Sequence, residues 1–98
     1  MLLDKDKIRH LKSLAHQRKP VVLIGQKGLT ENVLNEVKLA LDHHELIKIK
    51  VNVGDRDDRN DIIDSLTADT GATCIQRIGN IAVLFLRNEK KPVIVFAG

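Results

Sequence analysis

The feature that most constrains the fold is the segment from Leu46 to Val53, LIKIKVNV, in which apolar and polar residues alternate. Its odd-numbered positions are all Ile or Val, and in an extended chain they point to the side opposite Lys48, Lys50 and Asn52. This period of two predicts a β-strand with one buried face. Apolar residues at helical spacing precede and follow the strand, so the pattern indicates an α/β fold.

Three segments have apolar residues three and four positions apart, the spacing of one helix face, and are predicted helices: residues 4–18, 30–44 and 55–71. Pro20 stops the first, since the residue before a proline avoids helical conformation. Thr30 is suited to cap the start of the second. Gly71 is suited to end the third.

Three further segments are predicted strands: residues 21–24, 73–78 and 81–87. The first, VVLI, is entirely apolar, which predicts a strand buried on both faces. The other two flank Gly79-Asn80, a dipeptide that favours a two-residue hairpin. The order is therefore α-β-α-β-α-β-β, with three parallel strands and one antiparallel strand in a mixed four-stranded sheet packed with helices. Residues 88–98 form a tail that is either loose or, through Val93–Ala97, an added edge strand.

The length of 98 residues predicts a single domain over residues 1–98, and a monomer is expected. The longest apolar run, from Ile81 to Leu86, is far shorter than the roughly 20 residues of a membrane span. The N-terminus lacks the apolar stretch of a signal peptide, and the single cysteine, Cys74, cannot form an internal disulfide. We therefore expect a cytoplasmic protein that makes no membrane contact.

Charge is unevenly distributed along the chain. Residues 1–30 contain seven Lys/Arg and two Asp/Glu, residues 31–70 contain five and ten, and residues 71–98 contain four and one. A basic N-terminal part beside an acidic middle favours a polyanionic partner that approaches from one side. Chance unevenness of the kind found in many soluble proteins is the alternative.

The basic N-terminal part includes a Gly-x-x-Gly loop, Gly25-Gln26-Lys27-Gly28, between a predicted strand and a predicted helix. Glycines allow positive φ and let an anion approach the backbone, while the helix start and Lys27 supply positive charge. The loop could therefore hold phosphates through its amides. It matches neither a Walker loop nor the dinucleotide fingerprint, so a plain tight turn is the alternative.

Neither catalysis nor a metal or cofactor site is expected. The histidines lack the i, i+4 spacing of a helical zinc site, and no nucleophile has an evident base beside it. The acidic run that starts at Asp55 has Asn60 at its sixth position and Leu66 at its twelfth, which excludes an EF-hand calcium loop.

Three blocks of the chain resemble the CRM domain family (chloroplast RNA splicing and ribosome maturation), in particular its stand-alone bacterial YhbY-like members: KPVVLIGQKGLTENVL at 19–34, ALDHHELIKIKV at 40–51 and TGATCIQRIGNIAVLF at 70–85. This resemblance implies a fold similar to the C-terminal domain of translation initiation factor three. It also implies an RNA-binding protein that assists ribosome assembly on precursors of the large subunit, with a KH-like Gly-x-x-Gly loop on the RNA side. In that family an aromatic residue directly precedes an arginine at the end of the last strand, whereas here Leu86 separates Phe85 from Arg87, so the side on which Arg87 lies stays open.

The candidate RNA contacts form two groups: Gly25, Gln26, Lys27 and Gly28 in the loop, and Lys5, Arg9 and Lys12 on one face of the first predicted helix. The helix face could instead be plain solvated surface. Phe85 and Phe96 lie in apolar runs and are expected in the core, so with no Tyr or Trp we expect recognition of RNA backbone and shape. The alternative function is a protein-interaction module whose acidic residues 55–64 dock a basic ribosomal protein.

Overall fold

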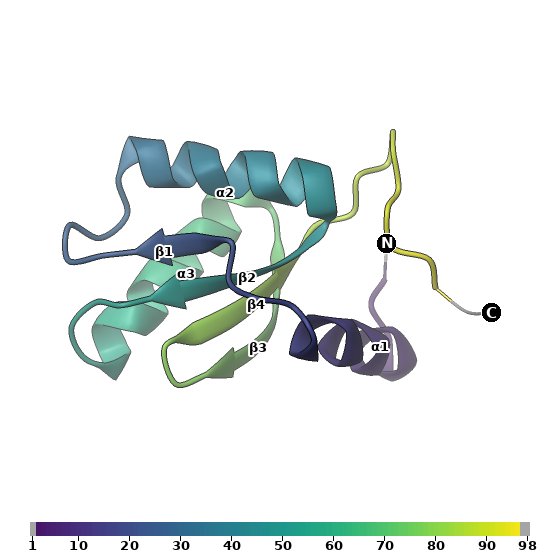
Figure 1. Ribbon diagram of the computed structural model, residues 1–98, viewed down its shortest axis with the longest axis horizontal. Coiled ribbons are helices and arrows are strands. Elements are labelled where there is room, and N and C mark those ends of the chain that lie inside the picture. The colour runs from purple at the N-terminus through teal and green to yellow at the C-terminus, as the bar shows by residue number, and fades with distance from the viewer. Residues whose placement is uncertain (1, 97–98) are drawn as a thin grey trace.

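The computed structural model describes residues 2–96 and contains one four-stranded sheet with the strand order β1-β2-β4-β3 (Figure 1). The strands are β1 (Val22–Ile24), β2 (Leu46–Val51), β3 (Thr73–Ile78) and β4 (Ile81–Phe85). β1 pairs with β2 in parallel, and β4 is antiparallel to both of its neighbours. β1, β2 and β3 therefore run in the same direction, as predicted, and β4 lies between β2 and β3.

The three predicted helices are present as α1 (Lys5–His16), α2 (Glu31–His44) and α3 (Arg56–Thr70). Each begins after a residue whose side chain accepts a backbone hydrogen bond from the first turn: Asp4, Thr30 and Asp55. Such caps satisfy amides that have no partner within the helix. Gly71 ends α3 in the left-handed conformation, with φ 78°, so the predicted roles of Thr30 and Gly71 are confirmed.

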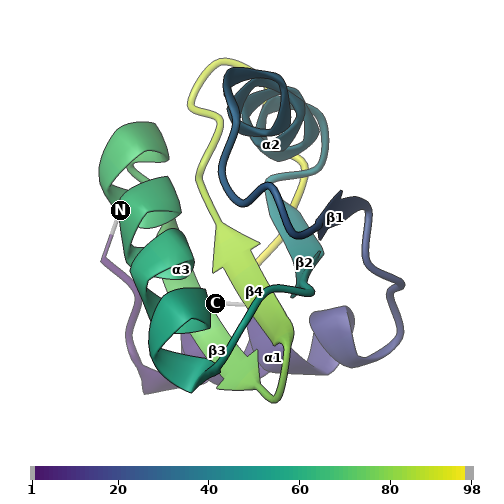
Figure 2. The ribbon, with the colours of Figure 1, turned by 90° about the vertical axis from the view of Figure 1, so that its left-hand side faces the viewer.

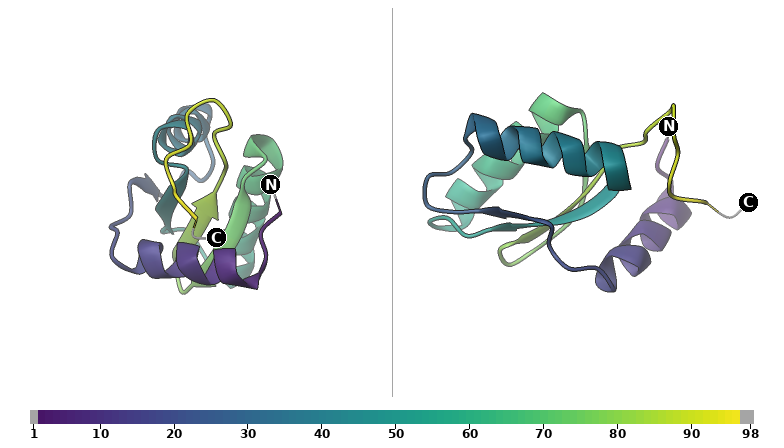
Figure 3. Two further views of the ribbon diagram at one scale, coloured as in Figure 1. Left: turned by 90° about the vertical axis from the view of Figure 1, so that its right-hand side faces the viewer. Right: turned by 45° about the horizontal axis from the view of Figure 1, so that its top comes forward.

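The helices cover both faces of the sheet, with α2 and α3 on one face and α1 on the other (Figures 2 and 3). Under α2 and α3 lies a core that includes Ile24, Ile49 and Leu84. Under α1 lies a second, smaller core that includes Leu11 and Phe85. Successive residues of β4 alternate between the two cores, which explains why this strand is apolar at every position.

The prediction that Val21–Ile24 is buried on both faces is wrong. β1 is an edge strand, and only Val22 and Ile24, which face α2, are buried. Leu23 points to the other face and is 61% exposed, because α1 packs mainly against β2 and β3. A continuous apolar run is therefore not sufficient to identify a central strand.

The C-terminal tail is neither loose nor an edge strand over its described residues. It follows an irregular path back across the α1 side of the sheet, where Ile94 is buried and Phe96 is half-buried in the second core (Figure 3). The Phe96 ring contacts the edge of Phe85 at a centroid distance of 5.9 Å, which confirms the prediction that both aromatic residues belong to the core. Ala97, part of the predicted edge strand, lies outside the described residues.

Glu45, at the junction of α2 and β2, fastens this tail. Its side chain is fully buried and its carboxylate accepts hydrogen bonds from the backbone N–H groups of Asn88, Val93 and Ile94 at 2.6–2.7 Å. Arg87 forms an ion pair with Glu45 at 3.3 Å and also donates to the Ile94 carbonyl at 2.7 Å. Arg87 therefore points into the structure on the α1 side, and its role here is to hold the tail.

Burial by itself would raise the pKa of the Glu45 carboxyl. The N–H groups of Ile94, Asn88 and Val93, together with the charge of Arg87, outweigh burial and hold that pKa below its ordinary value. Glu45 is thus ionised, and both of its carboxylate oxygens accept hydrogen bonds from backbone N–H groups. No sequence pattern predicts this role, since Glu45 is a single glutamate that follows two histidines.

Candidate nucleic-acid interface

The Gly-x-x-Gly loop forms a tight turn that leaves the sheet directly after β1. The Gly28 N–H donates to the Gly25 carbonyl at 2.9 Å, which makes Gln26 and Lys27 the two central residues of a four-residue turn. Gly28 has φ 70°, a conformation that strains any residue with a Cβ. The second glycine is therefore required by the turn itself.

The turn projects from one end of the sheet, as Figure 1 shows for the connection between β1 and α2. Gln26 and Lys27 are both exposed, and a Cβ placed on Gly25 would meet nothing within 4 Å. The Gln26 side-chain amide donates to the Asn52 carbonyl at 3.4 Å, which links the turn to the end of β2. A ligand can thus approach the Gly25 backbone closely, with the Lys27 ammonium beside it.

Fewer amides are available in the turn than the sequence suggested. The Gly28 N–H is used inside the turn, and the Val33 N–H at the start of α2 donates to the Thr30 hydroxyl at 3.2 Å. α2 begins at Glu31, so a carboxylate also occupies the positive end of this helix. The turn therefore offers an open backbone and one mobile cation, without a full ring of amide donors.

The three basic candidates on α1 do not lie beside the loop. α1 packs under the half of the sheet remote from the loop, so the two predicted groups occupy separate parts of the molecule (Figures 1 and 3). Arg9 and Lys12 line a groove of 560 Å³ between α1 and the sheet, where Lys48 of β2 joins them. Lys5 is exposed at the start of α1 and does not line this groove.

The acidic segment 55–64 is partly engaged within the molecule. Asp55 caps α3, and Asp64 accepts a 2.6 Å hydrogen bond from the Arg77 guanidinium of β3, which raises the pKa of Arg77. Asp57, Asp58 and Asp61 are exposed. Only this part of the acidic segment is open to a basic partner.

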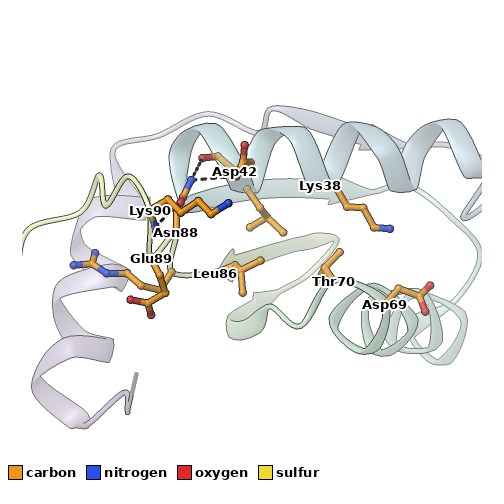
Figure 4. Close-up of a pocket in the computed structure, with 10 residues that line it drawn as sticks. Lys38, Asp42, Asp69, Thr70, Leu86, Asn88, Glu89 and Lys90 are labelled. Atoms are coloured by element: carbon orange, nitrogen blue, oxygen red, sulfur yellow. Dashed lines mark hydrogen bonds between the residues drawn. The ribbon is translucent and has the colours of Figure 1, made fainter.

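A second pocket, of 470 Å³, lies between the C-terminal ends of α2 and α3 and the start of the tail (Figure 4). There Asn88 donates to the carbonyl and the carboxylate of Asp42 at 2.9 and 3.0 Å. Its ionisable lining residues are three acids and three bases: Asp42, Asp69, Glu89, Lys38, Arg87 and Lys90. Mixed charge makes this pocket a poor match for a polyanion.

Residues 2–96 contain neither a metal-binding cluster nor a membrane-spanning helix. No group of three or more His, Cys, Asp or Glu residues is arranged to hold a metal ion in that range. Over the same residues, no helix combines the length and the apolar character needed to cross a membrane.

Comparison with known proteins gives a consistent result. The model of the CRS1/YhbY (CRM) domain family matches residues 3–85. An RNA-binding protein of Haemophilus influenzae is 47% identical over 83 residues, which cover 85% of this chain and 84% of the relative. A probable RNA-binding protein of Pseudomonas aeruginosa is 40% identical over 90 residues, covering 92% and 86% of the two chains.

A relative known by its solution structure comes from Staphylococcus aureus. It is 31% identical, it superimposes with a TM-score of 0.77, and the alignment covers 90% of this chain and 92% of that one. The mixed α/β fold predicted from the sequence is therefore shared with this relative.

Proposed function

Because the chain belongs to the CRS1/YhbY (CRM) domain family, we propose that it is a non-catalytic RNA-binding protein that acts in assembly of the large ribosomal subunit. The observation that carries the RNA-binding part is the match, over most of the chain, to relatives that are named RNA-binding proteins. The ribosomal part rests on the family resemblance alone. Ribosomal RNA within large-subunit precursors is the proposed partner.

In this proposal the Gly25–Gly28 turn binds the RNA backbone. Gly25 lets a phosphate approach without a Cβ in the way, and the exposed Lys27 ammonium neutralises its charge. Arg9 and Lys12, in the groove under the sheet, provide a second region of positive charge, and Lys5 extends it toward the start of α1. Binding through such contacts releases counterions, so affinity should fall steeply as salt rises.

The direct test is fluorescence anisotropy with a labelled fragment of large-subunit ribosomal RNA, measured at several salt concentrations. Lys27→Glu should weaken binding and make its salt dependence less steep. Lys38→Glu is the matched control, because it makes the same change of charge at an exposed position on α2. Equal affinity for Lys27→Glu and the wild type would refute the role of the turn.

Gly25→Asp is a second variant for the same assay. Gly25 has neither a positive φ nor a neighbour within 4 Å, so aspartate fits without backbone strain and places a negative charge at the proposed phosphate site. At Gly28 the same substitution would add strain from φ 70°, and lost binding there could reflect misfolding. Gly25→Asp therefore separates loss of binding from loss of structure.

A sucrose gradient of cell lysate at low salt tests the ribosomal part. The tagged protein should sediment with particles near the size of the large subunit, and Gly25→Asp should stay at the top. If the wild type also stays at the top, the protein does not associate with ribosomal precursors.

The second candidate function is docking of a basic ribosomal protein on α3. The exposed carboxylates of Asp57, Asp58 and Asp61 favour it. Charge reversal at Asp57 and Asp61 should release the protein from ribosomal particles and leave its binding to naked RNA intact. RNA binding through the turn predicts that particle association survives this change.

A further inference from the structure

On the α1 side of the sheet part of the surface stays exposed, since Leu23 and Ile78 are 61% and 63% exposed. α1 packs its buried residues Leu11 and Ala15 over the part of the sheet that contains Phe85. Beyond the end of α1 the strand register places four side chains in one row across the same face: Leu23, Lys50, Ile81 and Ile78. We call this row, together with Lys48 and Val83 in the adjoining row, the open sheet face.

The open sheet face is unusually apolar for an exposed surface. Ile78 is 63% exposed and Leu23 is 61% exposed, while Ile81 is half-buried between them. Lys50 stands between Leu23 and Ile81 in the row and is its one basic residue. Leu23 and Ile78 thus expose aliphatic surface that neither core uses, whereas Val83 is 3% exposed and belongs to the second core.

The groove between α1 and the sheet continues the open sheet face. Val83, Ile81 and Ile78 form its floor, and Arg9, Lys12 and Lys48 stand around it. None of its nine lining residues is Asp or Glu. Arg9 lies 3.7 Å from the carboxylate of Asp6, and both side chains are highly exposed. Exposed ion pairs are weak, so Asp6 neutralises little of the charge of Arg9.

We propose that the open sheet face and its groove bind a short single-stranded segment of RNA. The flat faces of unpaired bases lie on the aliphatic floor, and the phosphates between them face Arg9, Lys12, Lys48 and Lys50. The apolar floor selects for bases, and the basic rim, whose lining includes no Asp or Glu, selects for a polyanion. This inference deepens the proposed function and rests on it.

The occupant is single-stranded because a duplex hides its base faces within the stack. A duplex could offer only phosphates to the rim and would leave Ile78 and Leu23 exposed. Base contact through aliphatic side chains is weaker than stacking on aromatic rings, so little sequence preference is expected. The surface therefore adds affinity for unpaired regions, while the Gly25–Gly28 turn binds backbone elsewhere.

The test compares anisotropy titrations of a labelled eight-nucleotide single strand and of a duplex with the same sequence. Ile78→Asp should weaken binding of the single strand about tenfold, equivalent to about 1.4 kcal/mol. It should change binding of the duplex less than twofold. Leu39→Asp is the matched control, since it makes the same substitution at a 71% exposed residue of α2 on the opposite side of the sheet.

A second measurement uses the wild-type protein and depends on no variant. An eight-nucleotide single strand with 4-thiouridine at each position should photo-crosslink to the tryptic peptide of residues 78–87, which contains Ile78, Ile81 and Val83. The peptide of residues 19–27 contains both Leu23 and most of the turn, so it cannot distinguish the two sites. Absence of crosslinks from the peptide of residues 78–87 would overturn the proposal.

Three outcomes separate this proposal from the proposed function. Normal single-strand binding by Ile78→Asp, with weak binding by Lys27→Glu, would overturn the open sheet face and leave the proposed function standing. Failure of the wild type to bind either RNA would overturn both. Displacement of the single strand by an equal concentration of a poly-glutamate peptide would show a general anion groove, and would overturn the proposal of base contact.

Discussion

Glu45→Gln should destabilise the protein by about 3 kcal/mol, at the lower end of the roughly 3–5 kcal/mol lost when one partner of a buried ion pair is removed. In the native structure Oε1 accepts from the Val93 and Ile94 amides and Oε2 from the Asn88 amide. Glutamine turns one of these oxygens into an NH₂ donor. At least one backbone N–H then loses its acceptor, and an unsatisfied buried donor costs about 1–3 kcal/mol. Arg87 still donates to the Ile94 carbonyl but loses its ionic partner.

The loss of stability in Glu45→Gln cannot exceed the free energy needed to detach the tail from the sheet. If the tail leaves the sheet, its amides regain water, and the remaining cost is exposure of Ile94 and Phe96 in the second core. Trypsin should then cleave the variant rapidly after Arg87 and Lys90, while the sheet stays folded. Slow cleavage combined with lower global stability would indicate that the tail and the sheet unfold together.

The dependence of folding stability on pH follows from the lowered pKa of Glu45. In the unfolded chain the carboxyl titrates near the ordinary glutamate value of about 4.3, and in the folded protein it titrates lower. Between these two values the unfolded state binds more protons, so stability is full above the unfolded pKa and is lost as the pH falls through the folded pKa. Glu45→Gln should lose less stability on acidification than the wild type.

Urea unfolding followed by far-UV circular dichroism, at pH 7 and at pH values below 4, measures the stability lost in Glu45→Gln and the dependence of stability on pH. Tryptophan and tyrosine are absent from the sequence, so their fluorescence cannot serve. Glu89→Gln is the control, because it removes the same charge from an exposed position of the tail. If Glu45→Gln changes stability no more than Glu89→Gln does, the carboxylate does not fasten the tail.

Three further predictions concern stability and use the same urea assay. Leu23→Ser should change the free energy of unfolding by less than about 0.5 kcal/mol, whereas Ile24→Ala should lower it by about 2–5 kcal/mol, because only the Ile24 side chain is buried. Equal costs would show that β1 is buried on both faces. Gly71→Ala should cost about 1–2 kcal/mol through its φ of 78°, since the added methyl group meets no neighbour; a neutral result would contradict the left-handed end of α3. Asp55→Ala should cost about 1 kcal/mol by removing the cap of α3, and an unchanged midpoint would show that the cap is dispensable.

Most elements of the fold could be predicted because their signals are local. The alternation over 46–53, the capping residue Thr30 and the left-handed glycine at 71 each depend on neighbouring residues alone. The structure has the cap and the glycine in place, and β2 covers residues 46–51 of the predicted strand. The strand direction also followed, because a helix between two strands of one sheet brings the second back parallel to the first. Errors at strand ends, such as β4 ending at Phe85, are small by comparison.

What could not be predicted depends on contacts between distant segments. The exposure of Leu23 depends on where α1 stops, and the burial of Glu45 depends on a tail 42 or more residues away. Of the candidate site, the turn and its projecting Lys27 were visible in the sequence. The groove was not, because Arg9 and Ile78 are brought together only by the packing of α1 on the sheet.

The central position of β4 has a consequence for synthesis of the chain. β4 is the last of these four strands to be made, yet it supplies all the described pairing between the β1–β2 part of the sheet and β3. Until residues 81–85 have left the translating ribosome, β3 has no partner and both cores lack their shared strand. Vectorial synthesis therefore cannot fold this sheet strand by strand, and closure of the sheet is a single event that follows emergence of residues 81–85.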